Sequence, residues 1–238
     1  MSEPSRGAPH GDARRAVRGA WPPCALLVGF IGLAVVSYRA KGGIALDHEV
    51  LGWLVEHRRG GITTAAIIIT NAGSPAAMVL LAVAASVTLW RRRSPRTAVV
   101  VVATLALAYA MSTLTKTLVG AHRPPRAVQL VLALDQSYPS GHVTGTLALL
   151  GIVAVVCGRG RSRLIQAALA VGVGTATLVV ALTRLYLGVH WLIDVVGGCL
   201  LGSAAVLVGS SVLGRVATAH PGSLGHADTP APTTSQVG

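Results

Sequence analysis

Six ionisable side chains stand at the ends of apolar segments, where their types suit group-transfer chemistry: Lys116, Arg123, His142, Arg184, His190 and Asp194. Charged groups at membrane depth are costly, so a chain that keeps them there generally uses them. The lysine and the arginines suit a tetrahedral anion such as phosphate. The histidines and the carboxylate suit proton transfer and nucleophilic attack.

Lys116 and Arg123 do not share a helical face, because the chain between them is broken. We expect Gly120 to cap the helix that carries Lys116, and Pro124 and Pro125 push Arg123 out of the helical region. The two cations therefore meet only if the chain folds back over the helix end. Lys116 by itself also fits a snorkelling anchor at the membrane surface.

The stretch YPSGHVTG places helix breakers between two apolar runs. Pro139 ends a loop, and Ser140 is a natural N-cap for the helix that follows. The N–H groups of Gly141 and His142 then form a helix N-terminus that can bind an anion, and His142 could donate a proton. The alternative for this stretch alone is an ordinary capped helix with an interfacial histidine.

The stretch TRLYLGVHWLIDVVGG places His190 and Asp194 four residues apart, which predicts that they share one helical face. The carboxylate can accept a hydrogen bond from one imidazole nitrogen and leave the other as a nucleophile or base. Arg184 lies about 120° away from His190 on a continuous helix, so it reaches the pair only if the helix breaks near Gly188. The alternative is a buried structural pair.

The composition indicates an all-α membrane protein. Hydrophobic residues make up 52% of the 238 residues. Charged residues make up only 12%, whereas they are about a quarter of the residues in soluble domains. Six runs are long enough to span a bilayer: 22–38, 62–90, 97–118, 142–158, 164–182 and 193–214. We therefore predict an integral membrane six-helix bundle over residues 21–215. Asn71, Gly73 and Pro75 predict a kink or a short interfacial helix within the second run.

The positive charges fall in short clusters between these runs, so the net charge of +12 does not predict a nucleic-acid partner. Most arginine clusters share one side, which predicts a cell-membrane protein with both termini in the cytoplasm and the six ionisable groups outside it. Residues 1–20 and 216–238 are expected to be disordered cytoplasmic tails. Residues 44–58 predict an amphipathic helix on the outer surface, with Asp47 away from its apolar face.

Taken together, the three stretches resemble the type 2 phosphatidic acid phosphatase superfamily, whose motifs are K-x6-RP, PSGH and SR-x5-H-x3-D. Their order and internal spacing match, and the resemblance covers roughly residues 44–214. Two positions depart from the pattern. Thr183 replaces the usual serine but keeps a hydroxyl, and Ala121, where the family often has arginine, removes one possible phosphate contact.

The resemblance implies a phosphohydrolase that uses neither a metal nor another cofactor, with its site at the outer leaflet. His190 would attack phosphorus, Asp194 would hold its ring, and His142 would protonate the leaving oxygen. Five residues would bind the phosphoryl oxygens: Lys116, Arg123, Ser140, Gly141 and Arg184. No metal-ligand spacing of His, Cys or carboxylates competes with this interpretation.

The predicted function is hydrolysis of a lipid phosphate or an isoprenoid diphosphate through a phosphohistidine. Phosphatidic acid, phosphatidylglycerol phosphate and undecaprenyl diphosphate all remain open as substrates, as does the oligomeric state. The alternative is a membrane transporter or binding protein for an anion or lipid, although the charges lie at one end of the spans and not at the midplane. A haloperoxidase with a similar site is disfavoured by the six spans.

Overall fold

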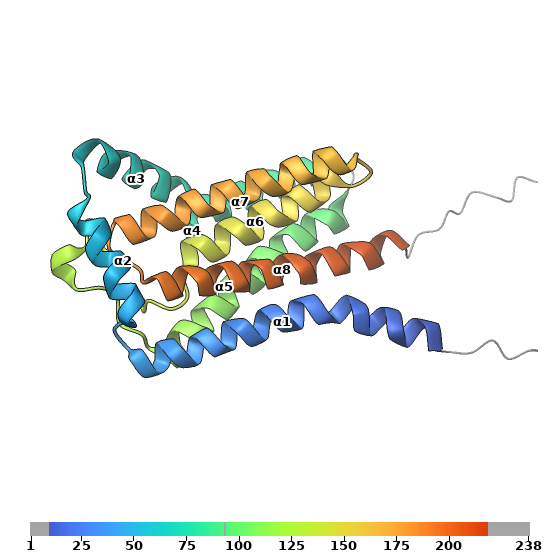
Figure 1. Cartoon of the computed structure of the whole chain (residues 1–238). Coiled ribbons are helices and arrows are strands. Elements are labelled where there is room, and N and C mark those ends of the chain that lie inside the picture. The colour runs from blue at the N-terminus through green and yellow to red at the C-terminus, as the bar shows by residue number, and fades with distance from the viewer. Residues whose placement is uncertain (1–9, 93, 219–238) are drawn as a thin grey trace, which may run out of the picture.

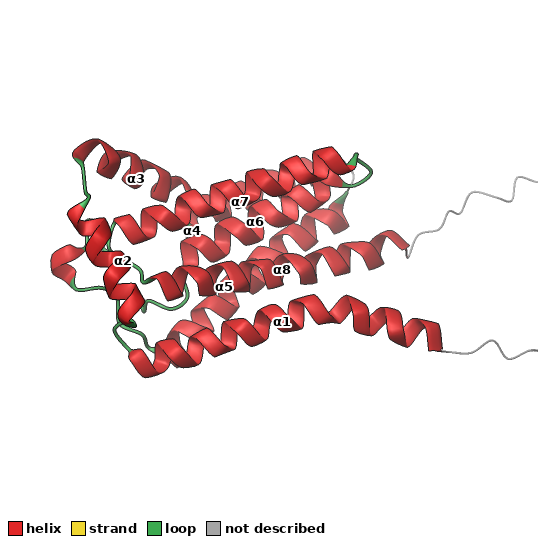
Figure 2. Cartoon of the chain, viewed as in Figure 1, coloured by secondary structure: helices red, strands yellow, loops and turns green. Residues whose placement is uncertain are grey.

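The computed structural model describes residues 10–92 and 94–218, and within these ranges the chain is helical with short loops and no strand (Figure 2). The helices are α1 (His10–Ala40), α2 (Ala45–Glu56), α3 (Gly60–Ala72), α4 (Pro75–Arg91), α5 (Pro95–Val119), the 3-10 turn η1 (Arg126–Val128), α6 (Gly141–Gly158), α7 (Arg163–Tyr186) and α8 (Leu192–Thr218). The predicted all-α class is confirmed.

The membrane spans follow the apolar runs. α5, α6, α7, α8 and residues 21–40 of α1 are each long and apolar enough to cross a bilayer, and α3 with α4 provides a sixth span if the pair counts as one. The pair is bent by 46°, which confirms the predicted kink. Pro75 begins α4, where its missing N–H is not needed, and the Ser74 hydroxyl accepts from the Ala77 N–H at 3.2 Å.

α6 lies in the middle of the bundle (Figure 1). It packs against α5, α7 and α8, while α1 packs on α8 and α4 on α5. The buried core between these helices is made of medium-sized apolar side chains, which include Val101, Leu105, Leu149, Ile152 and Leu213. Close packing around α6 fixes the relative positions of the helix ends, and those ends carry the ionisable residues.

α2 is the helix predicted over 44–58, and it runs across one end of the bundle (Figure 1). The prediction that Asp47 points away from the packed side is wrong, because its side chain is buried. Its carboxylate accepts from the backbone N–H of Ile44 at 2.8 Å and of Ile193 at 3.0 Å. Helix N-termini leave N–H groups unpaired, so one carboxylate here ties the start of α2 to the first turn of α8.

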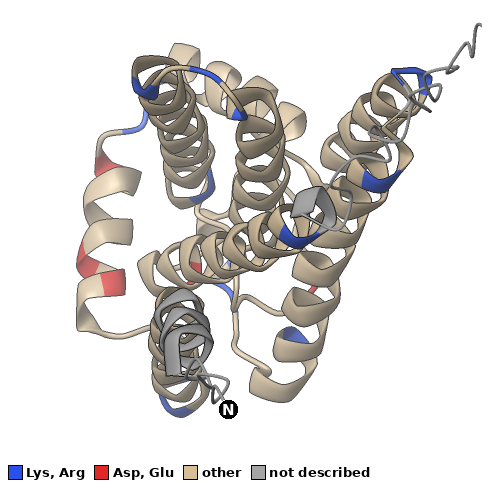
Figure 3. Cartoon of the chain, turned by 90° about the vertical axis from the view of Figure 1, so that its right-hand side faces the viewer, with Lys and Arg blue, Asp and Glu red and all other residues tan. Residues whose placement is uncertain are grey.

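The ends of the bundle differ from the predicted boundaries. α1 begins at His10 and so includes residues 10–20, which were expected to be disordered; the Ala and Arg residues there are strong helix formers. α8 continues to Thr218, beyond the predicted end at 215. The other expected tail residues, 1–9 and 219–238, lie outside the described residues. The start of α1 and the end of α8 lie at the same end of the bundle, which Figure 3 views end-on.

Candidate active site

The predicted site residues gather at the end of the bundle opposite the start of α1 (Figure 1). Lys116 lies in the last turn of α5, His142 in the first turn of α6, Arg184 in the last turn of α7 and Asp194 in the first turn of α8. Gly120 has the left-handed φ of 58° that a helix C-cap needs, as predicted. The chain then turns back over the helix ends as the loop 120–140, hereafter the return loop.

The return loop brings Lys116 and Arg123 together, as the sequence analysis required. Both hold the carboxylate of Asp135: the Lys116 Nζ lies 3.1 Å from Oδ2, and the Arg123 Nη2 lies 2.7 Å from Oδ1. The Nε of Arg123 also donates to the Asp135 backbone oxygen at 2.7 Å. Lys116 is thus part of a buried cationic pair, which its interpretation as a surface anchor does not explain.

The two ring nitrogens of His190 contact different partners, a carboxylate and a guanidinium. Its Nδ1 lies 3.2 Å from Asp194 Oδ2, and its Nε2 lies 3.1 Å from the Arg123 Nη1. A guanidinium can only donate, so Nε2 is the acceptor and the ring proton is on Nδ1, where it is donated to Asp194. This places the lone pair of His190 on the nitrogen that faces the cations.

The contact between His190 and Asp194 forms for a different reason from the predicted one. His190 precedes α8, so the two residues do not share a helical face; Asp194 instead turns back over the start of its helix. Its Oδ2 accepts from the Trp191 backbone N–H at 2.8 Å and from the Ser137 hydroxyl. The break predicted near Gly188 is present: α7 ends at Tyr186, and Gly188 has a φ of 68°.

The PSGH stretch begins α6 with Ser140 at the N-cap position, as predicted, but the serine side chain makes no capping hydrogen bond. Ser140 has the extended backbone of an N-cap, yet its hydroxyl is buried and has no hydrogen-bond partner within the described residues. Its N–H donates to the Asp194 backbone oxygen at 3.0 Å. A Cβ added to Gly141 would meet nothing within 4 Å. The backbone at Gly141 is therefore open to a ligand, and the Ser140 hydroxyl lies buried beside it.

Arg184 reaches the site from the end of α7. Its Nη1 donates to the Thr70 hydroxyl at 2.9 Å. Thr70 lies in the last turn of α3, just before the bend between α3 and α4. The Nε of Arg184 is buried with no partner within the described residues. The Thr183 hydroxyl bonds within its own helix, to the Val180 oxygen at 2.7 Å, and the buried Ala121 accepts from the Ser137 N–H at 2.9 Å through its backbone.

A cavity of about 420 Å³ joins these groups. Its polar lining consists of Arg123, Asp135, Gly141, His142, Arg184 and His190, and its apolar lining of Pro75, Leu132, Ala133 and Leu134. Three predicted residues lie one layer behind the lining: Lys116 behind Asp135, Asp194 behind His190, and Ser140 next to Gly141. All eight predicted residues are therefore within or directly behind one cavity.

The charges around this cavity favour a neutral His190. Burial lowers the pKa of the His190 ring well below its usual value of 6.5, and the positive charges of Arg123, Arg184 and Lys116 lower this pKa further. Asp135 behaves differently: partial burial raises its pKa, but Lys116 and Arg123 outweigh that effect and leave the pKa below its usual value. The site therefore combines a neutral imidazole with an ionised carboxylate.

Three residues around the site were missed by the sequence analysis. Asp135 pairs the two cations, Ser137 donates to Asp194, and Arg58 donates to the Tyr186 oxygen at 2.9 Å and the Val128 oxygen at 2.8 Å. Arg58 thereby joins the end of α7 to the return loop. The one signal available was that Asp135 is the sole acidic residue of a loop with cations near its start.

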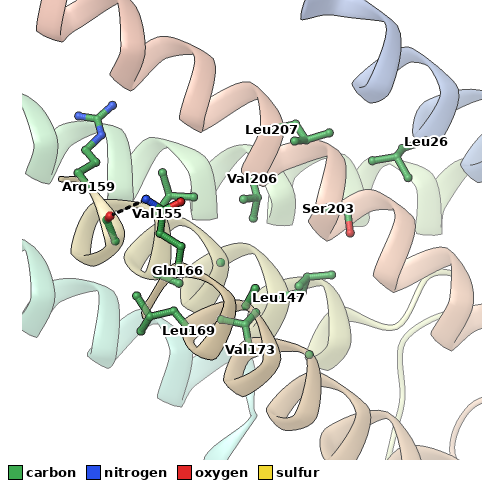
Figure 4. Close-up of a pocket in the computed structure, with 15 residues that line it drawn as sticks. Leu26, Leu147, Val155, Arg159, Gln166, Leu169, Val173, Ser203, Val206 and Leu207 are labelled. Carbon is green, nitrogen blue, oxygen red and sulfur yellow. Dashed lines mark hydrogen bonds between the residues drawn. The ribbon is translucent and has the colours of Figure 1, made fainter. Parts of the chain in front are cut away.

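Two other observations bear on the site. A larger cavity of about 690 Å³ lies between α1, α6, α7 and α8, lined by side chains such as Leu26, Leu147, Leu169 and Leu207, and contains none of the predicted site residues (Figure 4). Its lining is mostly apolar, and Arg159, Gln166 and Ser203 are the polar side chains in it. Among residues 10–92 and 94–218, no three His, Cys, Asp or Glu side chains form a group that could hold a metal ion.

The comparisons with known proteins agree with the motifs. The family model of the PAP2 superfamily matches residues 97–216. A crystal structure of a transmembrane PAP2 type phosphatidylglycerolphosphate phosphatase from Bacillus subtilis is 19% identical, with a TM-score of 0.73, over 82% of this chain and 98% of that one. That of Aquifex aeolicus LpxE is 19% identical, with a TM-score of 0.55, over 70% and 95%. At this identity both show the fold. No curated protein matches the sequence.

Proposed function

The chain belongs to the PAP2 superfamily, and on that premise we propose that it is a membrane phosphatase that hydrolyses a lipid phosphate or an isoprenoid diphosphate. The observation that carries the proposal is the 420 Å³ cavity, which joins a histidine lone pair, cationic side chains and an apolar rim. A phosphate bound there would lie among the cations while its hydrocarbon chain leaves across the rim.

The proposed reaction has two steps. The Nε2 lone pair of His190 attacks phosphorus, the bond from phosphorus to the lipid oxygen breaks, and His142 gives a proton to that oxygen. For the attack, the Nη1 of Arg123 must turn from Nε2 to a phosphoryl oxygen. The Asp194 carboxylate, which accepts the Nδ1–H of His190, stabilises the positive charge that develops on the ring. Water then attacks the phosphohistidine, His142 takes a proton from it, and phosphate leaves.

Charge stabilisation in this proposal comes from the protein itself. Lys116, Arg123 and Arg184 are the cations, and the Ser140 hydroxyl and the Gly141 N–H at the start of α6 are the neutral donors. Such preorganised donors stabilise a transition state without reorganising during the reaction. We therefore propose that no metal ion is needed, so activity should survive excess EDTA and fall with vanadate, which mimics the transition state.

The apolar rim supports a lipid substrate. Leu132 and Leu134 line the cavity from the return loop, and their side chains are 66% and 83% exposed. Exposed leucines next to a charged site suit the first carbon atoms of an acyl or isoprenoid chain. If the predicted orientation holds, the rim faces the outer leaflet and the substrate remains anchored in the bilayer.

The test is phosphate release by detergent-purified protein on phosphatidic acid, phosphatidylglycerol phosphate and undecaprenyl diphosphate, with a water-soluble phosphate ester as control. Leu134→Ser should lower kcat/KM about tenfold on the preferred lipid and leave the soluble ester unchanged. Leu130→Ser is the matched control, because Leu130 lies on the same loop outside the cavity lining. Release from no lipid, or loss on chelation with recovery in Mg²⁺, would contradict the proposal; anion uptake without hydrolysis would favour transport.

A further inference from the structure

Asp135 holds the two cations to which the motif pattern assigns the phosphate. Its carboxylate lies 3.1 Å from the Lys116 Nζ and 2.7 Å from the Arg123 Nη2. The two cationic side chains are 10% and 9% exposed, whereas the Asp135 side chain is 58% exposed. The Asp135 carboxylate of the return loop therefore covers the two buried cations from the open side of the site.

The carboxylate also shares the cavity with the reacting groups. Asp135 lines it together with Arg184 and both histidines. Lys116 and Arg123 keep the pKa of Asp135 below its usual value against the effect of partial burial, so the group is ionised at neutral pH. A phosphoryl group bound to Lys116 and Arg123 would meet this negative charge at close range, and like charges at such distances repel. The carboxylate and the phosphate therefore compete for one position.

We propose that Asp135 is a specificity-determining residue: an internal anion that a terminal phosphate displaces and a phosphodiester does not. This inference rests on the proposed function, since it concerns the same cavity. A terminal phosphate carries up to two negative charges and three unesterified oxygens, which exceeds what a carboxylate offers to the same cations. A phosphodiester carries one charge and two such oxygens, the same as Asp135, and so gains nothing by exchange.

The selection suits a site beside a bilayer. The common phospholipids of a membrane are phosphodiesters, and a bare cationic cavity with an apolar rim would bind their head groups. A competing carboxylate weakens the binding of every anion by the same factor. Only the more highly charged anion then still binds well. The exposure of Asp135 matters here, because a displaced carboxylate can move into water without the cost of burial.

The test measures binding without turnover. Purified wild-type protein and Asp135→Asn are titrated calorimetrically with inorganic phosphate and with dimethyl phosphate, a phosphodiester of one charge, above the second pKa of phosphate. Loss of one charge-assisted competitor should tighten the binding of both anions about tenfold, so that dimethyl phosphate binds the variant measurably. Wild type should bind phosphate and reject dimethyl phosphate. Asp135→Glu should keep the wild-type selectivity.

Glu49→Gln is the matched control, since it removes one negative charge from an exposed position on α2 and should leave both affinities unchanged. If Asp135→Asn fails to fold, Asp135→Ser carries the same expectation. Unchanged or weaker phosphate binding, or continued rejection of dimethyl phosphate, would overturn the inference. If wild type hydrolyses lipid phosphates while these affinities stay unchanged, the inference alone fails. If neither protein binds phosphate, the proposed function fails with it.

Discussion

Removing the carboxylate of Asp47 should destabilise the end of the bundle that carries the site. The buried N–H of Ile193 would lose its partner, at a cost of about 1–3 kcal/mol. The N–H of Ile44 is partly exposed and would be hydrated, so the loss of its hydrogen bond to Asp47 costs about 0.5–1.5 kcal/mol. Asp47→Ala should therefore lower the free energy of unfolding by about 1.5–4.5 kcal/mol and the unfolding temperature by roughly 3–18 °C.

The assay is thermal unfolding of the detergent-purified protein, followed by near-UV circular dichroism. Glu49→Ala is the control: Glu49 lies on the same helix, is exposed, and should change stability by no more than about 0.5 kcal/mol. Asp47→Asn keeps one acceptor oxygen and should fall between the two. An Asp47→Ala protein that unfolds together with the Glu49→Ala control would refute the view that this carboxylate holds the start of α8.

Three other predictions concern the histidines, acid stability and orientation. His190→Ala should abolish turnover on every substrate, whereas His142→Ala should recover much of its activity on an aryl phosphate, whose leaving group needs little protonation; the reverse pattern would exchange their roles. Because the pKa of His190 is lower in the folded state than the 6.5 of an exposed histidine, stability should fall as pH drops below about 6.5, and a pH-independent unfolding temperature there would contradict this. A reporter fused after Gly238 should be cytoplasmic and one within 126–135 extracytoplasmic; opposite results would reverse the topology.

The resting contacts of the site have a consequence for the proposed reaction. The carboxylate and the backbone oxygen of Asp135 hold Arg123, and Arg123 in turn donates to the lone pair of His190. The lone pair that the proposed reaction uses is thus hydrogen-bonded as long as the Asp135 carboxylate holds Arg123. A phosphate that displaces Asp135 offers Arg123 a better acceptor, so substrate binding and release of the His190 lone pair would occur together.

The sequence alone determined those features that depend on neighbouring residues along the chain. Run length and composition identified the spans, because a bilayer fixes the number of apolar residues that a helix needs. The breaks at Gly120, Gly188 and the PSGH stretch followed from the conformations that glycine and proline favour. The spacing of the three motifs identified the eight candidate residues, and the structure gathers all of them at one cavity.

Only the tertiary structure decided which side chains from distant segments meet. Nothing local shows that Asp47 reaches the start of α8, that Ser137 donates to Asp194, or that Thr70 bonds Arg184 across the bend between α3 and α4. Asp135 looks like an ordinary loop carboxylate until the return loop lays it over two cations. Such pairs depend on the path of the chain after all helices have packed, and a buried charge takes whichever partner that packing provides, because leaving it unpaired costs too much.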